Sequence, residues 1–139
     1  MHKARKLERL LRVRTLQLGQ VRAEEAAARA RFGQEAALRE RIAQLVAGVA
    51  PAQSAGFGAT MIAAAHYRER LHQSAHAADR RVEVAANNVS TAASATQEAR
   101  RDQSAIEKLI AREKAEAALE ALRALEKLPA TVRNRHDPC

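Results

Sequence analysis

Two histidines four residues apart come nearest to forming a chemical site in this sequence. His72 and His76 share one face of any helix that contains them, and Glu69 and Asp79 flank the pair. A zinc site needs further ligands and an outer shell that orients them, and the chain has no HExxH motif. The pattern therefore predicts a solvated helix face and no bound metal.

The rest of the sequence offers little chemistry. It shows no Ser/His/Asp or Cys/His arrangement and no phosphate-binding loop. The single cysteine, Cys139, cannot form an internal disulfide, which favours a reducing compartment. No stretch approaches the ~18 apolar residues of a membrane span, and the basic start of the chain lacks the apolar run of a signal peptide. We expect a non-enzymatic cytoplasmic protein without a cofactor and without membrane insertion.

The composition is typical of long helices. The chain has 139 residues, of which 47% are apolar, 2% aromatic and 29% charged. Alanine accounts for 34 residues, about half of the apolar content, and its methyl group buries little area. A surplus of Ala, Glu, Arg and Leu favours coiled coils over sheets or a compact globular core.

Glycine and proline divide the chain into two helices. Between Ala59 and Leu128 there is neither Gly nor Pro, and the first segment carries only Gly19 and Gly33. We therefore predict one all-α domain over 1–139, a two-helix antiparallel coiled-coil hairpin with a longer second helix. The expected parts are a helix at about 2–47, a loop at about 48–58, a helix at about 59–128 and a tail at 129–139. Within 85–99, the Asn, Ser and Thr residues are mediocre helix formers, so the sequence leaves a continuous helix and a local bend both open.

Apolar spacing predicts how the helices pair. In the first helix, Leu7, Leu11, Leu18 and Val21 follow coiled-coil spacing, with Arg14 in the skipped position. Pairing outward from the loop places Leu7 near Arg100, so residues after about Ser104 lack a partner within the chain. This overhang would contain Ile106, Leu109, Ile110, Leu119, Leu122, Leu125 and Leu128. An exposed stripe of this kind predicts a partner at the end where both termini lie.

The net charge and its distribution indicate the chemistry of the expected partner. The chain carries a formal net charge of +8, and residues 1–14 hold six basic side chains against Glu8. Such a terminus steers towards an acidic surface. Nucleic acid is the alternative, but a DNA-binding motif and stacking aromatics are missing, so we expect no nucleic-acid partner. A basic architectural protein and a plain coiled-coil dimerisation module stay open as alternatives.

One region in each predicted helix carries a family resemblance. The region in the first helix consists of Leu7-Glu8-Arg9-Leu10-Leu11-Arg12-Val13-Arg14, followed by Arg22-Ala23-Glu24-Glu25-Ala26. The region in the second helix is Ile106-Glu107-Lys108-Leu109-Ile110-Ala111-Arg112-Glu113. With these, the chain resembles the FliJ/YscO family of type III secretion stalk proteins, flagellar or injectisome. Leu128-Pro129 replaces the family's acidic pair, which leaves the two branches open with a slight preference for the injectisome.

The resemblance implies a mechanism. Family members are antiparallel coiled coils similar to the central stalk of rotary ATPases. The end with both termini inserts into the hexameric secretion ATPase and promotes its assembly and activity. The loop side contacts the cytoplasmic domain of the export-gate membrane protein, and members also interact with export chaperones. The expected location is the cytoplasm, peripheral to the membrane-embedded export apparatus.

The resemblance also implies two sets of contact residues. Basic and apolar side chains of the terminal end would contact the ATPase: Arg5, Lys6, Arg9, Arg12, Ile106, Ile110, Leu119, Leu122 and Leu125. Residues on both helices near the loop would contact the gate: Gln34, Leu38, Arg41, Leu45, Tyr67, Leu71, Ser74 and Ala78. For Leu38 and Leu45, the 3-4 spacing favours the helix seam over a partner surface, whereas Tyr67 fits an exposed contact and a packed one equally.

Overall fold

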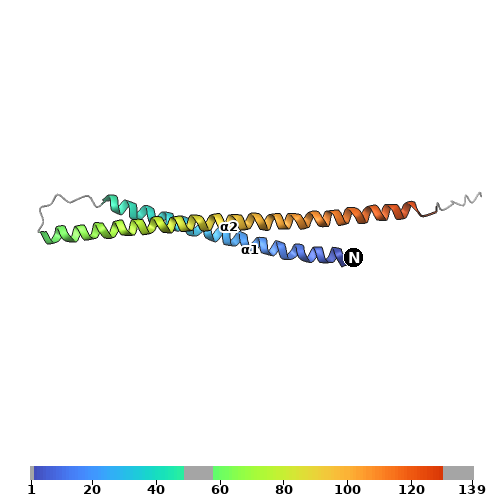
Figure 1. Cartoon of the computed structure of the whole chain (residues 1–139), viewed down its shortest axis with the longest axis horizontal. Coiled ribbons are helices and arrows are strands. Elements are labelled where there is room, and N and C mark those ends of the chain that lie inside the picture. Colours follow the sequence, from blue (N-terminus) through green and yellow to red (C-terminus); the bar gives the residue numbers. More distant parts are fainter. Residues whose placement is uncertain (1, 49–57, 130–139) are drawn as a thin grey trace, which may run out of the picture.

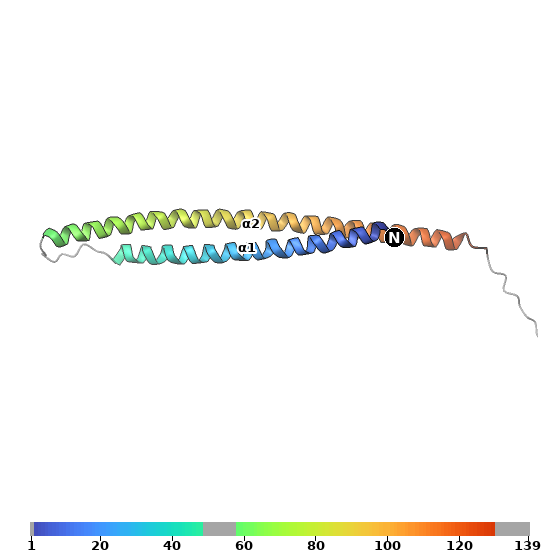
Figure 2. The same ribbon diagram turned by 90° about the horizontal axis from the view of Figure 1, so that it is seen from below.

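The computed structural model describes residues 2–48 and 58–129, which form two long helices lying side by side (Figures 1 and 2). Helix α1 spans His2–Gly48 and helix α2 spans Gly58–Glu126. The predicted all-α hairpin with a longer second helix is confirmed. Most of the predicted loop and tail lies outside the described residues. Neither helix contains a segment long and apolar enough to cross a membrane.

Both helices run without interruption. Helix α1 continues through Gly19 and Gly33, and α2 continues through 85–99, where the sequence allowed a bend. Helix α2 ends at Glu126, shortly before Pro129, because proline cannot continue the backbone hydrogen bonding of a helix. One tighter turn follows helix α2, in which the Leu128 amide donates to the Leu125 carbonyl oxygen at 3.1 Å.

Ion pairs between the helices define the antiparallel register. Lys3 Nζ lies 2.8 Å from Glu113 Oε2, and Arg39 Nε lies 2.9 Å from Asp79 Oδ1. The residue numbers within these pairs add up to 116 and 118. The predicted pairing of Leu7 with Arg100 was therefore wrong by about ten residues, or roughly three turns. It assumed that pairing starts at the loop, whereas seam packing and charge pairs determine the register.

The seam of α1 keeps coiled-coil spacing without a break. Apart from half-buried Ala36, its least exposed positions alternate by four and three residues, with exposed Phe32 and Arg39 at two of the steps. They are Leu7, Leu11, Arg14, Leu18, Val21, Glu25, Ala28, Glu35, Ile42 and Val46. The predicted seam from Leu7 to Val21 is thus confirmed. In Figure 1, α1 lies above α2 near the loop and below it near the termini.

The core is thin and built from small side chains. Leu18, Ala78, Ala85, Ile106 and Thr96 are the buried residues in the described part of the chain. The Thr96 hydroxyl lies 3.1 Å from the carbonyl oxygen of Ala92 and 3.5 Å from that of Val21 on the other helix. A side chain reaching the opposite backbone shows a close approach, which the surrounding alanines permit.

Candidate partner-binding surfaces

Helix α2 extends beyond the start of α1 at the end of the hairpin where α1 begins and α2 ends (Figure 2). Lys3 is paired with Glu113, and Lys114 still lines a crevice with Ala4 and Leu7 of α1, so the part of α2 from Ala115 to Glu126 lies beyond the pairing and is called the overhang. The overhang is about three turns long. It is shorter than the sequence predicted, because the true register moves Ile106 and Ile110 back against α1.

Two of the predicted ATPase contacts therefore belong to the seam. Ile106 is only 6% exposed and Ile110 is half-buried. Ile110 lines a small crevice together with Ala4 and Leu7 of α1. Both isoleucines pack within the chain, so the expectation that they lie free in the overhang was wrong.

The overhang exposes its leucines on a different side of α2 from the seam. Leu119, Leu122 and Leu125 are 53%, 56% and 62% exposed. At about 100° per residue, Leu122 lies roughly 160° around the helix from Ile106. The seam spacing continues instead at Ala117, Glu120 and Ala124, which form no apolar stripe. The leucine row is therefore a separate apolar surface, unpaired in the hairpin.

The first turns of α1 carry a basic surface at the same end of the hairpin as the overhang. Four of the predicted ATPase contacts are exposed and form no ion pair with any described residue: Arg5, Lys6, Arg9 and Arg12. Two further cations are held by α2, since Lys3 pairs with Glu113 and Arg14 Nη1 lies 3.0 Å from Asp102 Oδ2. The Glu113 carboxylate raises the pKa of Lys3 by accepting its hydrogen bond and by its charge.

Apolar side chains accompany these cations. Leu10, Val13 and Leu16 are all exposed on the same three turns of α1. The sequence analysis did not select them as contacts. Their spacing by three residues repeats that of Leu119, Leu122 and Leu125, and this shared spacing is the signal that would have found them. The terminal end thus combines positive charge with exposed apolar surface on both helices.

The predicted gate patch divides into an exposed part and a packed part. Six of its residues are exposed: Gln34, Leu38, Arg41, Leu45, Tyr67 and Ser74. The other two belong to the seam, because Leu71 is half-buried and Ala78 is 0% exposed. The preference for Leu38 and Leu45 as seam residues was therefore wrong, and Tyr67 takes the exposed alternative. The seam passes through Ile42 and Val46 instead.

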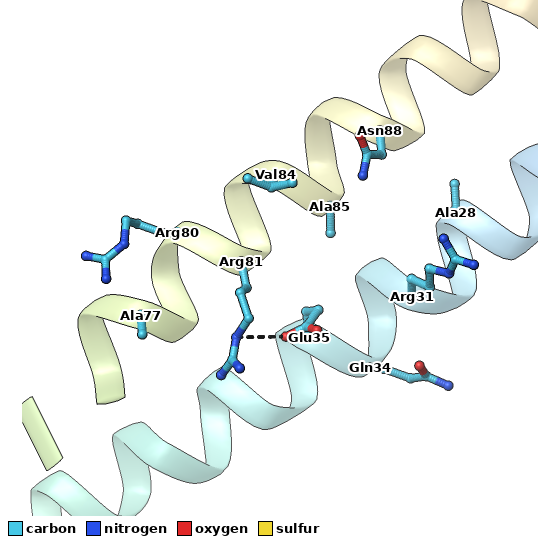
Figure 3. A pocket seen from close by; sticks show the side chains of 10 residues that line it. All are labelled: Ala28, Arg31, Gln34, Glu35, Ala77, Arg80, Arg81, Val84, Ala85 and Asn88. Carbon is cyan, nitrogen blue, oxygen red and sulfur yellow. Dashed lines mark ion pairs between the residues drawn. The ribbon is translucent and has the colours of Figure 1, made fainter. Parts of the chain in front are cut away.

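A groove lies next to the exposed gate residues (Figure 3). It has a volume of about 490 Å³, and Gln34 belongs both to the lining of the groove and to the predicted gate contacts. Ala77 and Ala85 of α2 and Ala28 of α1 contribute its small side chains, and Arg31, Arg80 and Arg81 supply positive charge. Arg81 points across to α1, where its Nε lies 3.4 Å from Glu35 Oε2, while Arg80 points away (Figure 3). The sequence analysis missed this groove, because only the register brings Glu35 to Arg81.

The histidine pair stays on the surface. His72 and His76 are both exposed, and no group of three metal-ligating side chains occurs within residues 2–48 and 58–129. No protein-family model, no curated protein and no solved structure matches the chain.

Proposed function

We propose that this chain is the non-enzymatic stalk of a type III protein export apparatus. Its terminal end inserts into the hexameric secretion ATPase, and its loop side contacts the cytoplasmic domain of the export gate. It would act in the cytoplasm, peripheral to the membrane-embedded apparatus. The observation that carries the proposal is the overhang of α2, whose exposed leucine row lies beyond the end of α1 that carries the unpaired cations.

The distance between the two surfaces supports a linking role. The gate patch lies near the loop, and the overhang lies at the other end of a helix of 69 residues. At 1.5 Å per residue this helix is about 100 Å long. A rod of this length connects two large partners without enclosing either of them.

Stimulation of the cognate ATPase is the primary test of the proposal. Adding the protein to its cognate ATPase should increase hexamer formation and ATP turnover. Leu119→Asp and Leu122→Asp should abolish the stimulation while helicity stays near wild type, because neither side chain packs in the hairpin. Ala124→Asp lies on the seam-side face of the overhang and serves as the matched control. An active ATPase that does not respond to saturating protein refutes the proposal.

The gate surface is tested separately. Tyr67→Ala and Leu45→Ala remove exposed side chains, so gate binding should weaken while ATPase stimulation persists. We choose Leu45 over Leu71, because Leu71 is half-buried and its loss would also disturb packing. His72→Ala is the control, since His72 lies about 140° around α2 from Tyr67. Equal loss of both activities in the test variants would argue against two separate surfaces.

The exposed cations favour one alternative, a basic protein that binds nucleic acid. Arg5, Lys6, Arg9 and Arg12 form a positive surface of the kind that contacts phosphates. Retention on duplex DNA at ~0.15 M salt, lost in Arg9→Gln with Arg12→Gln, would support this alternative. The stalk proposal predicts that DNA is released at this salt concentration, whereas ATPase stimulation persists.

A further inference from the structure

A second groove lies between the two helices in the middle of the hairpin. It has a volume of about 620 Å³, and it is lined by Arg22 and Arg29 of α1 and by Arg100 of α2. We call it the mid-hairpin groove. Leu38 of the gate patch points about 180° away from Arg29, because nine residues of an α-helix turn about 900°. The mid-hairpin groove therefore lies on the opposite flank from the gate patch, and the overhang begins only at Ala115.

The mid-hairpin groove has an excess of positive charge. Its acidic residue, Glu25, is held by Arg29, whose Nη2 lies 2.6 Å from Glu25 Oε1. Arg22 and Arg100 are exposed and form no ion pair with any described residue. Two guanidinium groups from different helices thus line one space without a counter-charge, and each can bind a carboxylate through two parallel hydrogen bonds. The charge favours a partner with acidic side chains.

Small residues let the backbone of a partner approach this groove. Ala26 of α1 and Ala93 of α2 lie among the arginines. Gly19 and Gly33 lie seven residues before and after Ala26, so all three point in nearly the same direction. No described atom outside the turns of α1 around them lies within 4 Å of a methyl group built at either glycine. The hairpin itself therefore does not need glycine there, whereas a closely packed neighbour would.

The seven-residue spacing favours a helix as the occupant. Arg22 and Arg29 lie seven residues apart beside the seam of α1, at the positions whose charges select the partner in coiled coils. A third helix with the same repeat would follow the supercoil of the hairpin and stay in the groove over several turns. An acidic residue at every seventh position would then meet Arg22 and Arg29 in turn, about 10.5 Å apart along the axis.

A second copy of the chain and a nucleic acid both fit this groove less well. A second copy has the same net charge of +8 and the same three arginines, so repulsion between like charges opposes self-association. A nucleic acid would bring its phosphates against the carboxylate of Glu25. Single strands also bind by stacking on aromatic side chains, and none lines this groove.

We propose that the mid-hairpin groove binds an acidic helix of a partner protein, so that the hairpin forms two helices of a three-helix bundle. Carboxylates of the bound helix pair with Arg22, Arg29 and Arg100, and its backbone lies close to Ala26. This surface is separate from the overhang and from the gate patch, and the inference does not depend on the proposed stalk function.

Binding of a designed peptide tests the proposal. The probe is a fluorescent helical peptide of about 28 residues, with glutamates at seven-residue intervals on both sides of an Ala/Leu face. The control peptide has Gln in place of every Glu. Fluorescence anisotropy with the full-length chain should show binding of the acidic peptide, and the Gln peptide should bind at least about tenfold more weakly. The affinity for the acidic peptide should fall as the salt concentration rises.

Charge variants locate the binding. Arg22→Gln with Arg100→Gln should raise the Kd at least about fivefold, because both side chains lose their carboxylate partners. Arg101→Gln with Lys108→Gln removes the same charge from the outer face of α2 and is the matched control. All four side chains are exposed, so helicity should stay near wild type. Equal loss of binding in both double variants would show attraction by net charge alone and would overturn the proposal.

A size variant tests the close approach. Ala26→Leu should raise the Kd at least about tenfold, because the larger side chain fills the space for the partner backbone. Ala27→Leu is the matched control, since Ala27 is also exposed and points about 100° away around α1. Equal binding by the two leucine variants would overturn the proposal.

Three further outcomes would also overturn it. The acidic peptide fails to bind wild-type protein. Duplex DNA binds at ~0.15 M salt and is released by Arg22→Gln with Arg100→Gln but not by the charge control, which would make a nucleic acid the occupant. Sedimentation shows self-association that the same double variant abolishes, which would make a second copy the occupant. ATPase stimulation should persist in all these variants, so the stalk proposal and this inference fail separately.

Discussion

Truncating Ile106 and truncating Leu122 should have opposite consequences, although both residues are large aliphatics on the same helix. Ile106→Ala removes three carbon atoms from a side chain that is 6% exposed. At ~0.8 kcal/mol per buried carbon, the loss is about 2.4 kcal/mol of the free energy of unfolding. The value stays near the low end for buried aliphatics, because an open two-helix seam can close over the gap. Leu122→Ala changes an exposed site, so its effect should stay within about 0.5 kcal/mol.

Urea denaturation followed by far-UV circular dichroism measures both effects. Ile106→Ala should lower the midpoint with an unchanged slope, and Leu122→Ala should leave the midpoint in place. The effects on ATPase stimulation should be the reverse. The Ile106→Ala variant should still stimulate the ATPase at temperatures where the hairpin stays folded, whereas the Leu122→Ala variant should stimulate it less. Equal destabilisation by the two substitutions would refute the register, because Ile106 would then not lie between the helices.

Three further substitutions test the helices and their register. Gly33→Ala should raise the free energy of unfolding by about 0.5–1 kcal/mol in urea melts, because nothing lies near the new methyl group and alanine favours the helix. Thr96→Leu should lower it by about 1–3 kcal/mol through overpacking, and an unchanged midpoint would contradict the close helix approach. Glu113→Gln should return the raised pKa of Lys3 towards 10.5 in an NMR titration. Since the folded-state pKa is the higher one, this contact stabilises the hairpin fully below 10.5 and is lost as the pH rises through the raised value.

The sequence was sufficient for the elements but not for their register. Two Gly- and Pro-poor runs predicted both helices to within two or three residues at each described end. The offset between the helices depends on contacts such as Arg39 with Asp79, between residues far apart in the chain. Local patterns do not contain such a contact. The overhang was therefore predicted correctly for Leu119, Leu122 and Leu125, but the prediction also included Ile106, Leu109 and Ile110, which the register places alongside α1.

The gate patch shows a second limit. Two sets of residues fit 3-4 spacing with Ile42. One set is Leu38 and Leu45, which hydrophobicity favours, and the other is Glu35 and Arg39, which continue the spacing of the α1 seam. The structure has the spacing that contains the charged residues, because Glu35 forms an ion pair with Arg81 of α2 and Arg39 forms one with Asp79. Extending the spacing from Leu7 onward without a break leads to this frame, so continuity over many turns was a better guide than local hydrophobicity.

The unbroken spacing of the α1 seam has a consequence for the shape of any assembly. A repeat of this kind imposes a left-handed supercoil with a pitch of about 150 Å, and the 47 residues of α1 extend about 70 Å. The helices thus exchange sides over roughly half a revolution, as the crossing in Figure 1 shows. Two partners that bind the same flank near the loop and near the termini would approach the rod from opposite directions. Bulky neighbours at the two ends can therefore be accommodated together without steric conflict.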